Sequence, residues 1–289
     1  MSYVIISDST TDLTNDFVLE NKIDIIPLKF YIKEKEYVNY LDSRELDTHA
    51  FYDLMREGEI SKTAQLNMVD IEKCFRHHLD LGNDILCIGF SSGLSGTYNA
   101  IRLTAEALQD EYKDRKILTI DSLCASLGEG LLVWYANKFK QEGLSLEENY
   151  QKVLDLRLRL AHWFTVDDID TLRRGGRVTN VQAFLAKGLK IKPVLHVDNE
   201  GKLIPVYKKI GRKVALKTLV MELAKTIDRS YKQTVMIGHG DTLEEANYVR
   251  DLIRQEVEVE DIYINNIGPV IGAHSGPGTI AIFFIANHR

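Results

Sequence analysis

Apolar runs of strand length alternate with amphipathic segments of helix length through the first half of the chain. We expect strands at residues 3–7, 24–32, 85–90 and 116–120, and helices near residue 17 and at 49–58, 69–81, 98–112 and 127–141. This alternation predicts a mostly parallel sheet covered by helices on both faces. Ligands of such sheets bind beyond the carboxyl ends of the strands. The polar segments that follow three of the strands, at residues 8–10, 92–97 and 121–122, should therefore cluster at one edge.

In the second half a hairpin interrupts this alternation. The turn residues Asp198-Asn199-Glu200-Gly201 join strand patterns at 192–197 and 203–207. The other expected elements are helices at 146–161, 213–228 and 243–256, an apolar run at 163–166, and strands at 234–238, 261–265 and 279–286. We predict two domains of the α/β class. Residues 1–160 form a three-layer α/β/α domain with a mostly parallel sheet, and residues 161–289 form a domain with a mixed sheet.

The composition is that of an ordinary globular protein. The 289 residues are 45% hydrophobic and 27% charged, and the net charge of -6 argues against broad nucleic-acid binding. No apolar run approaches the ~18 residues of a membrane span, and the chain starts with a strand pattern instead of a signal segment. Cys74, Cys87 and Cys124 form no CxxC pair, which indicates free structural thiols in a reducing compartment. We therefore expect a cytoplasmic protein.

Two glycine-containing segments are candidates for a ligand site. Residues 92–97 lie between a strand pattern and a helix pattern, where backbone N–H groups and the helix dipole attract anions. Serine and threonine also cap helices, but two serines and two glycines exceed what a cap requires, so we favour an anion site. Near the C-terminus, His274 lies among four glycines and two prolines, which predicts a rigid loop. That histidine is either a ligand contact or a structural residue of a tight turn.

The common catalytic motifs are missing or incomplete. No GxGxxG follows a strand and no GxxxxGK[ST] occurs, so we expect no nucleotide cofactor. Gly93-Leu94-Ser95-Gly96 is similar to a nucleophile elbow, but its second glycine comes one position early. HExxH is absent, and His77 and His78 face different sides of a helix, so we expect no metal site. Three arginines at 173–177 are either a solvated helix end or a contact to phosphate or an acidic partner.

Six segments in register resemble the motifs of the DegV family over nearly the whole chain. They are Asp8-Ser9-Thr10-x-Asp12-Leu13, Thr63 in a polar loop, Ser91-Ser92-x-Leu94-Ser95-Gly96-Thr97-Tyr98, Asp121-Ser122, Arg173-x-Gly175-Gly176-Arg177-Val178 and Gly268-Pro269-Val270-Ile271-Gly272-x-His274-x-Gly276-Pro277-Gly278. Each segment alone is weak, but all six occur in order and at fitting distances. The resemblance implies two α/β domains with a ligand between them.

The resemblance also implies a function in fatty acid phosphorylation. Characterised members of the family are the FakB-type subunits of bacterial fatty acid kinase. They hold a long-chain fatty acid while a separate kinase subunit uses ATP to phosphorylate its carboxylate for phospholipid synthesis. The expected partners are the fatty acid and the kinase subunit, with no cofactor or metal on this chain. Transient contact with a membrane surface during lipid exchange is a further expectation.

The site residues follow from the same resemblance. The implied ligand-binding residues are Thr63, Ser95, Gly96, His274 and, by a looser alignment near the entrance, Arg212. Arg173 matches the arginine linked to phosphoryl transfer with the kinase. The threonine loop departs from the family, because Thr63-Ala64-Gln65-Leu66-Asn67 lacks the usual proline and last serine but keeps the hydroxyl. Candidate residues for an apolar tunnel in the second domain are Phe164, Phe184, Leu185 and Phe283.

Two other functions stay open. Ser95 and His274 are also the nucleophile and base that a stand-alone acyl hydrolase or acyltransferase requires. A regulatory module that senses a different small acid would use the same loops.

Overall fold

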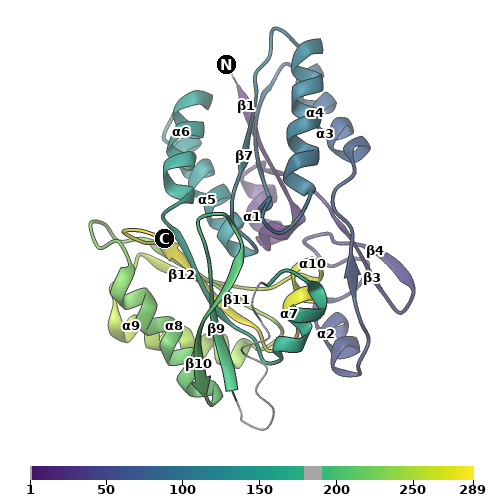
Figure 1. Cartoon of the computed structure of the whole chain (residues 1–289). Helices are drawn as coiled ribbons and strands as arrows, with labels where there is room; N and C mark the ends of the chain where they lie inside the picture. The colour runs from purple at the N-terminus through teal and green to yellow at the C-terminus, as the bar shows by residue number, and fades with distance from the viewer. Residues whose placement is uncertain (1, 179–190) are drawn as a thin grey trace.

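A four-stranded parallel sheet forms the core of the first half of the protein (Figure 1). The computed structural model describes residues 2–178 and 191–289. In order across the sheet, the strands are β2 (Asp24–Ile26), β1 (Tyr3–Asp8), β6 (Asp84–Gly89) and β7 (Ile117–Asp121). All three pairings are parallel.

Helices cover both faces of this sheet. The covering helices are α1 (Asn15–Glu20), α3 (Met68–Asp80), α4 (Thr97–Glu111), α5 (Leu127–Gln141) and α6 (Leu146–Arg157). Val4 and Ile6 pack into one core with α3 and α4, whereas Ile5 packs into a second core with α1, α5 and α6. Successive side chains of a strand point to opposite faces, so one apolar strand supplies both cores. The predicted three-layer arrangement is confirmed.

The second half contains a six-stranded mixed sheet. In order across the sheet, the strands are β10 (Leu203–Ile210), β9 (Ile191–Val197), β8 (Leu160–Thr165), β13 (Ile280–Ile285), β11 (Thr234–His239) and β12 (Asp261–Asn266). Among these described strands only β11 and β12 pair in parallel. Helices α8 (Arg212–Thr226) and α9 (Leu243–Glu256) pack on one face. No helix within residues 2–178 or 191–289 is long and apolar enough to cross a membrane.

The single strand expected at 24–32 is wrong. The chain breaks at Pro27, where the missing N–H ends the pairing of β2 with β1. The residues beyond form a small antiparallel sheet near α2 (Thr48–Arg56), built from β4 (Lys35–Val38), β3 (Lys29–Ile32) and β5 (Lys62–Thr63). Lys33 and Glu34 make the β3–β4 turn with φ of 50° and 60°. Non-glycine residues seldom adopt such values, so the sequence carries no usual turn signal there.

The helix expected at 146–161 is too long. Helix α6 ends at Arg157, and β8 begins three residues later. Arg159 donates from Nε to the carbonyl of Ala286, 3.1 Å away, which holds the connection against the end of the chain. From Leu160 onwards the backbone pairs with β13. Hydrogen bonds to a distant strand therefore override the local helix pattern.

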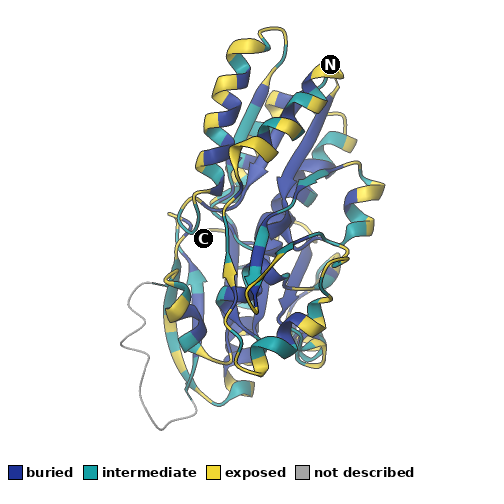
Figure 2. Cartoon of the chain, turned by 90° about the vertical axis from the view of Figure 1, so that its right-hand side faces the viewer, coloured by how far each residue is buried: buried dark blue, intermediate teal, exposed yellow. Residues whose placement is uncertain are grey.

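Helix α5 joins the two sheets into one packed interior. Its residues Leu131 and Leu132 belong to a core that contains Ile5 and Leu86 of the parallel sheet and Phe283 of the mixed sheet. Figure 2 shows buried strands running through both parts of the molecule, with exposed residues on the outer faces of the helices. The described strands of the two sheets come from residues 3–121 and 160–285. The domain boundary near residue 160 stays a prediction.

Candidate functional site

A cavity of about 340 Å³ lies between the two sheets, with walls supplied by both halves of the chain. This volume is within the range of small-molecule binding sites. Most of its wall is apolar and includes Phe90, Leu94, Phe164, Leu203, Ile267 and Phe283. The cavity is therefore suited to an apolar ligand.

Four of the five predicted ligand-binding residues line this cavity, namely Thr63, Ser95, Gly96 and His274. Phe164 and Phe283, two of the expected tunnel residues, line it as well. The other two, Phe184 and Leu185, lie outside the described residues. The apolar wall also includes Leu28 and Phe90 from the first half of the chain, so it is not confined to the expected second half.

Thr63 and His274 form the polar centre of the cavity. Thr63 ends β5, and His274 lies in the last turn of α10 (Pro269–Ser275). The Thr63 Oγ1 lies 2.9 Å from the His274 Nε2 in a hydrogen bond. The loop expected around His274 is wrong, because Pro269 occupies the first turn of a short helix. Proline is favoured there because its fixed φ suits the helix and no N–H is needed.

His274 is a neutral side chain near pH 7. Burial, with a smaller contribution from the charge of Arg177, lowers its pKa to about 4. Its Nδ1 is buried and has no hydrogen-bond partner among the described residues. Gly175 lies against this nitrogen, since a Cβ on Gly175 would come within 2.6 Å of it. The ring is therefore held between Thr63 and the end of α7 (Ile169–Gly175), which packs beside α10 (Figure 1).

Ser95 and Gly96 lie at the N-terminal end of α4, as the strand–loop–helix pattern predicts. The Ser95 Oγ lies 3.1 Å from the Thr97 Oγ1 and accepts a hydrogen bond from the Thr97 N–H at 3.2 Å. The first N–H groups of a helix lack partners within the helix and carry its positive dipole end. A Cβ on Gly96 would lie 2.0 Å from the Gln65 Oε1, so glycine permits the threonine loop to approach.

The strand-end loops meet at one edge, as predicted. Asp8, at the end of β1, accepts hydrogen bonds from the N–H of Thr10 at 2.9 Å and of Phe90 at 3.1 Å. Asp121, at the end of β7, accepts from the N–H of Ser92 at 3.1 Å. These bonds fix the ends of three neighbouring strands against each other. Thr10, in the short 3-10 helix η1 (Ser9–Thr11), consequently faces the cavity.

Buried carboxyl groups lie behind this edge. The Thr10 hydroxyl lies within hydrogen-bond distance of two carboxyl groups, those of Asp8 and, at 2.8 Å, of Glu129 of α5. Burial raises the pKa of both carboxyl groups, and the charge of Asp8 raises that of Glu129 further. Asp12 accepts from Ser126 and, at 2.9 Å, from the N–H of Gly268. Burial raises the pKa of Asp12 to about 7.

The arginines of the 173–177 segment have different surroundings. Arg177 lines the cavity and donates from Nε to the Leu94 carbonyl at 3.2 Å and from Nη1 to the Gly175 carbonyl at 2.6 Å. Arg173 lies outside the cavity wall, with 53% of its side chain exposed and its Nε 2.9 Å from the Asp170 Oδ1. It is therefore accessible to a second protein and not positioned to contact a ligand inside the cavity.

Arg212 lies apart from the other predicted site residues. Its Nη2 is 2.6 Å from the Glu245 Oε2 of α9, and it also donates to the Gly278 carbonyl. It does not belong to the cavity wall in the described part of the chain. Arg212 therefore connects α8 to α9 and to the turn before β13.

Several cavity residues were missed as individual candidates. Thr10 and Arg177 belong to motifs identified from the sequence. Their positions just after a strand and just after a helix could therefore have indicated a place in the site. Ser126 and His162 also line the cavity. His162 is buried inside β8, and burial lowers its pKa well below the usual value. One histidine in an apolar strand gives no signal that separates a cavity residue from an ordinary core residue.

Comparisons with known proteins agree on a family. The chain matches the family model described as "Uncharacterised protein, DegV family" over residues 2–287. A DegV domain-containing protein of Clostridium perfringens is 41% identical over 287 residues, which cover 99% of this chain and 98% of that protein.

Solved structures agree with the match. A DegV lipid-binding protein of Thermotoga maritima superposes with a TM-score of 0.87 at 29% identity and covers 100% of both chains. A DegV family protein of Thermus thermophilus, described by its fatty acid binding, gives a TM-score of 0.86 at 26% identity over 99% of this chain and 100% of that one. With its sequence and its fold in common with these proteins, the chain belongs to the DegV family.

Proposed function

We propose that the protein binds a long-chain fatty acid in the cavity between its two sheets. The observation that carries this proposal is an apolar cavity that contains the hydrogen-bonded pair Thr63 and His274 together with Ser95. Relatives from Thermotoga maritima and Thermus thermophilus are described as lipid-binding and fatty-acid-binding proteins, which supports the same ligand class here.

The carboxylate of the ligand requires donors that can replace water. The Ser95 hydroxyl can donate one hydrogen bond, and the Thr63 hydroxyl can donate another when the Nε2–H of the neutral His274 donates to Thr63. The first turn of α4 adds free N–H groups and the positive end of a helix dipole. Hydrogen bonds to a charged group are stronger than those between neutral groups. These groups are suited to hold an anion without a metal ion.

The acyl chain supplies most of the driving force. Burial is worth ~0.8 kcal/mol per methylene group, so a sixteen-carbon chain offers roughly 10 kcal/mol before the entropic cost of binding. The apolar wall of the cavity, which includes Phe90, Phe164 and Phe283, provides this surface. The carboxylate donors then fix the orientation of the ligand.

The proposal extends to presentation of the carboxylate to a separate ATP-dependent kinase subunit, which converts it to an acyl phosphate. The support is the exposed Arg173 on α7, which packs beside the helix that carries His274. The sequence has no phosphate-binding loop, so ATP would be bound by the partner. An arginine at the contact would offset the negative charge that gathers when the carboxylate meets the γ-phosphate.

The hydrolase alternative has less support from the geometry. A catalytic serine requires a hydrogen bond to its base, and the base requires a partner that orients it. Here the Ser95 hydroxyl contacts Thr97 and the His274 Nε2 contacts Thr63. Among the described residues the His274 Nδ1 has no partner at all.

Mass spectrometry of the purified protein tests the binding proposal. Under native conditions we expect a mass increase that matches one fatty acid, and under denaturing conditions the mass of the bare chain. Lipid extraction then identifies the acyl chain. A protein that carries no lipid and takes up no added palmitate or oleate would exclude the proposal. A mass increase that persists after denaturation would instead indicate an acyl-enzyme and support the hydrolase.

A further inference from the structure

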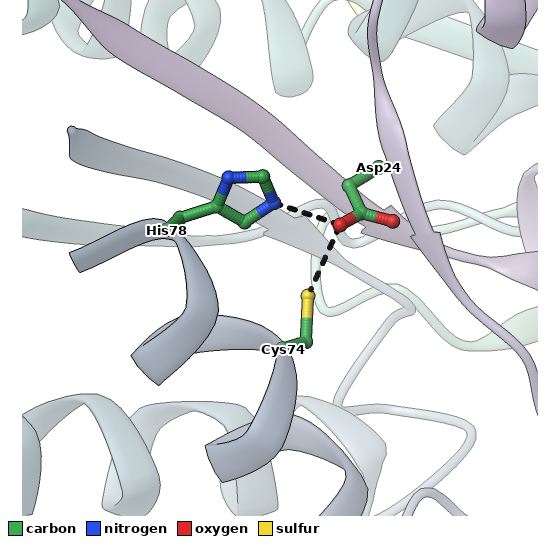
Figure 3. Close-up of side chains that lie close together, drawn as sticks. All are labelled: Asp24, Cys74 and His78. Carbon is green, nitrogen blue, oxygen red and sulfur yellow. Dashed lines mark hydrogen bonds and ion pairs between the residues drawn. The ribbon is translucent and has the colours of Figure 1, made fainter. Parts of the chain in front are cut away.

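A cluster of three different metal-ligand side chains lies on the first half of the protein, between α3 and the edge strand β2 (Figure 3). Cys74 and His78 are four residues apart and therefore on the same side of α3, and Asp24 is the first residue of β2. The His78 Nε2 lies 2.7 Å from the Asp24 Oδ2, and the Cys74 Sγ lies 3.6 Å from the same oxygen. The three side chains converge on one point.

We propose that Asp24, Cys74 and His78 bind a divalent transition-metal ion of the zinc class. A thiolate, an imidazole and a carboxylate are all ligands of Zn²⁺, and this mixture excludes magnesium and calcium, which prefer oxygen ligands alone. Two anionic ligands would also balance the charge of the ion. The site is distinct from the cavity proposed to bind a fatty acid, since none of its residues belongs to that cavity wall.

The distances require little rearrangement. In a tetrahedral zinc site with bonds of about 2.0–2.3 Å, ligand atoms lie about 3.3–3.6 Å apart. The sulfur and the carboxylate oxygen already have this separation. The histidine and the carboxylate must move apart by about 0.6 Å as the ion replaces their hydrogen bond. His78 and Asp24 keep 14% and 43% of their side chains exposed, so the ion can reach them and both side chains can adjust.

Space remains for a fourth ligand. Asp24 and Cys74 line a surface hollow of about 580 Å³ that borders the cluster. Three protein ligands and a solvent molecule in the fourth position are the usual arrangement of an open zinc site. The ion would connect α3 to β2. Along the chain, Thr63 comes shortly before α3, and Leu28 comes shortly after β2.

Two other groupings carry less weight. His49, Asp53 and Asp241 also lie close together, but the Arg56 Nη1 is 2.6 Å from the Asp241 Oδ2 and already neutralises that carboxylate. The rings of the adjacent His77 and His78 pack edge to face with their centroids 5.1 Å apart, and His77 is exposed. His78 instead bonds to Asp24, and Cys74, one helical turn earlier on α3, bonds to the same carboxylate oxygen.

Zinc and cobalt titrations of the reduced protein test the proposal. We expect one zinc ion per chain by calorimetry, and loss of at least about 100-fold in zinc affinity in both Cys74→Ser and His78→Gln, because each removes a direct ligand. With cobalt(II), the wild type should show the thiolate-to-metal absorption of a tetrahedral site, and Cys74→Ser should lose it. The matched control is His49→Gln, which should bind zinc like the wild type.

The fold is checked separately. Circular dichroism of the metal-free variants should match the wild type, and zinc should raise the melting temperature of the wild type and of His49→Gln but not of His78→Gln. If Cys74→Ser does not fold, Asp24→Asn takes its place with the same expected loss. Zinc affinity that persists in both ligand variants, or a wild type that retains no zinc at micromolar concentration, would overturn the proposal.

Discussion

The hydroxyl of Thr63 and the Nε2 of His274 are 2.9 Å apart, although 211 residues separate them in the chain. The threonine ends a two-residue strand of the small sheet, and the histidine lies on a helix between two strands of the mixed sheet. Each side chain thus holds the other in the cavity wall before any ligand enters. Binding groups that are ordered in advance lose less conformational entropy on association.

Removal of either hydroxyl should weaken fatty acid binding. We expect Thr63→Val and Ser95→Ala each to cost about 1.5–3 kcal/mol, which is about a 10- to 150-fold loss of affinity, because each removes a hydrogen bond to a charged group. Isothermal calorimetry with palmitate measures the effect. Thr226→Val is the control, because that hydroxyl bonds to the Glu222 carbonyl within its own helix. Wild-type affinity in both cavity variants would exclude the proposed headgroup site.

Arg173→Ala should separate binding from phosphoryl transfer. The side chain is exposed and outside the cavity wall, so bound fatty acid should stay unchanged, whereas acyl phosphate formed with a cognate kinase and ATP should fall about 100-fold or more. Bound lipid is measured by mass spectrometry and product by a coupled assay.

Arg102→Ala provides a matched control for that experiment. Arg102 is similarly exposed and is also paired with a carboxylate one helical turn away, Glu106. Both activities should stay normal in this variant. Normal product formation in Arg173→Ala would assign Arg173 to a solvated helix end, and loss of lipid together with product would place it in the ligand site.

Gly175→Ala should disturb the site through His274. A Cβ at this position would lie 2.6 Å from the His274 Nδ1, so the ring must move and its bond to Thr63 weakens. We expect about a 10-fold loss of fatty acid affinity, equivalent to ~1.4 kcal/mol. The neighbouring Gly176→Ala meets no atom within 4 Å but has a φ of 67°, so it should lower the free energy of unfolding by ~1 kcal/mol and leave affinity unchanged. Equal affinities in the two variants would contradict this account.

The raised pKa of Asp12 predicts the direction in which the stability of the protein changes with pH. Burial raises this pKa from 3.8 to about 7, so between these values the folded protein holds a proton that the unfolded chain has released. The stabilisation that comes from this bound proton is fully present below pH 3.8 and is lost as the pH rises to about 7. Chemical denaturation across this range should show the stability of Asp12→Asn rising relative to that of the wild type by on the order of 4 kcal/mol. A constant difference between the two proteins would show that Asp12 titrates normally.

Much of the fold was predictable because buried strands and amphipathic helices follow local periodicity. Helices α5 and α9 and the turn after β9 lie where the pattern places them. The errors occur where a distant partner decides the structure. Strand β5 has two residues and exists because it pairs with β3, and Leu160 leaves the helix pattern because it pairs with β13.

The candidate site divides in the same way. Ser95 and Thr10 follow strands of a parallel sheet, so their meeting at one edge follows from topology. The contact of His274 with Thr63 depends on how two halves of the chain pack, and no local pattern encodes it. The convergence of Asp24 with Cys74 also depends on tertiary packing, in this case of α3 against β2 within the first half, because spacing in the sequence reveals only the pair on α3.

Helix α5 limits how this protein can exchange parts with its relatives. One side of the helix packs on β1 and β6, and the other packs under β11 and β13. A chimera joined near residue 160 would carry α5 from one parent and the mixed sheet from the other. The recombined protein would then contain mismatched side chains along the whole buried seam, where each missing or added methylene is felt. Recombination between DegV proteins should therefore favour crossover points that keep α5 and the mixed sheet from the same parent.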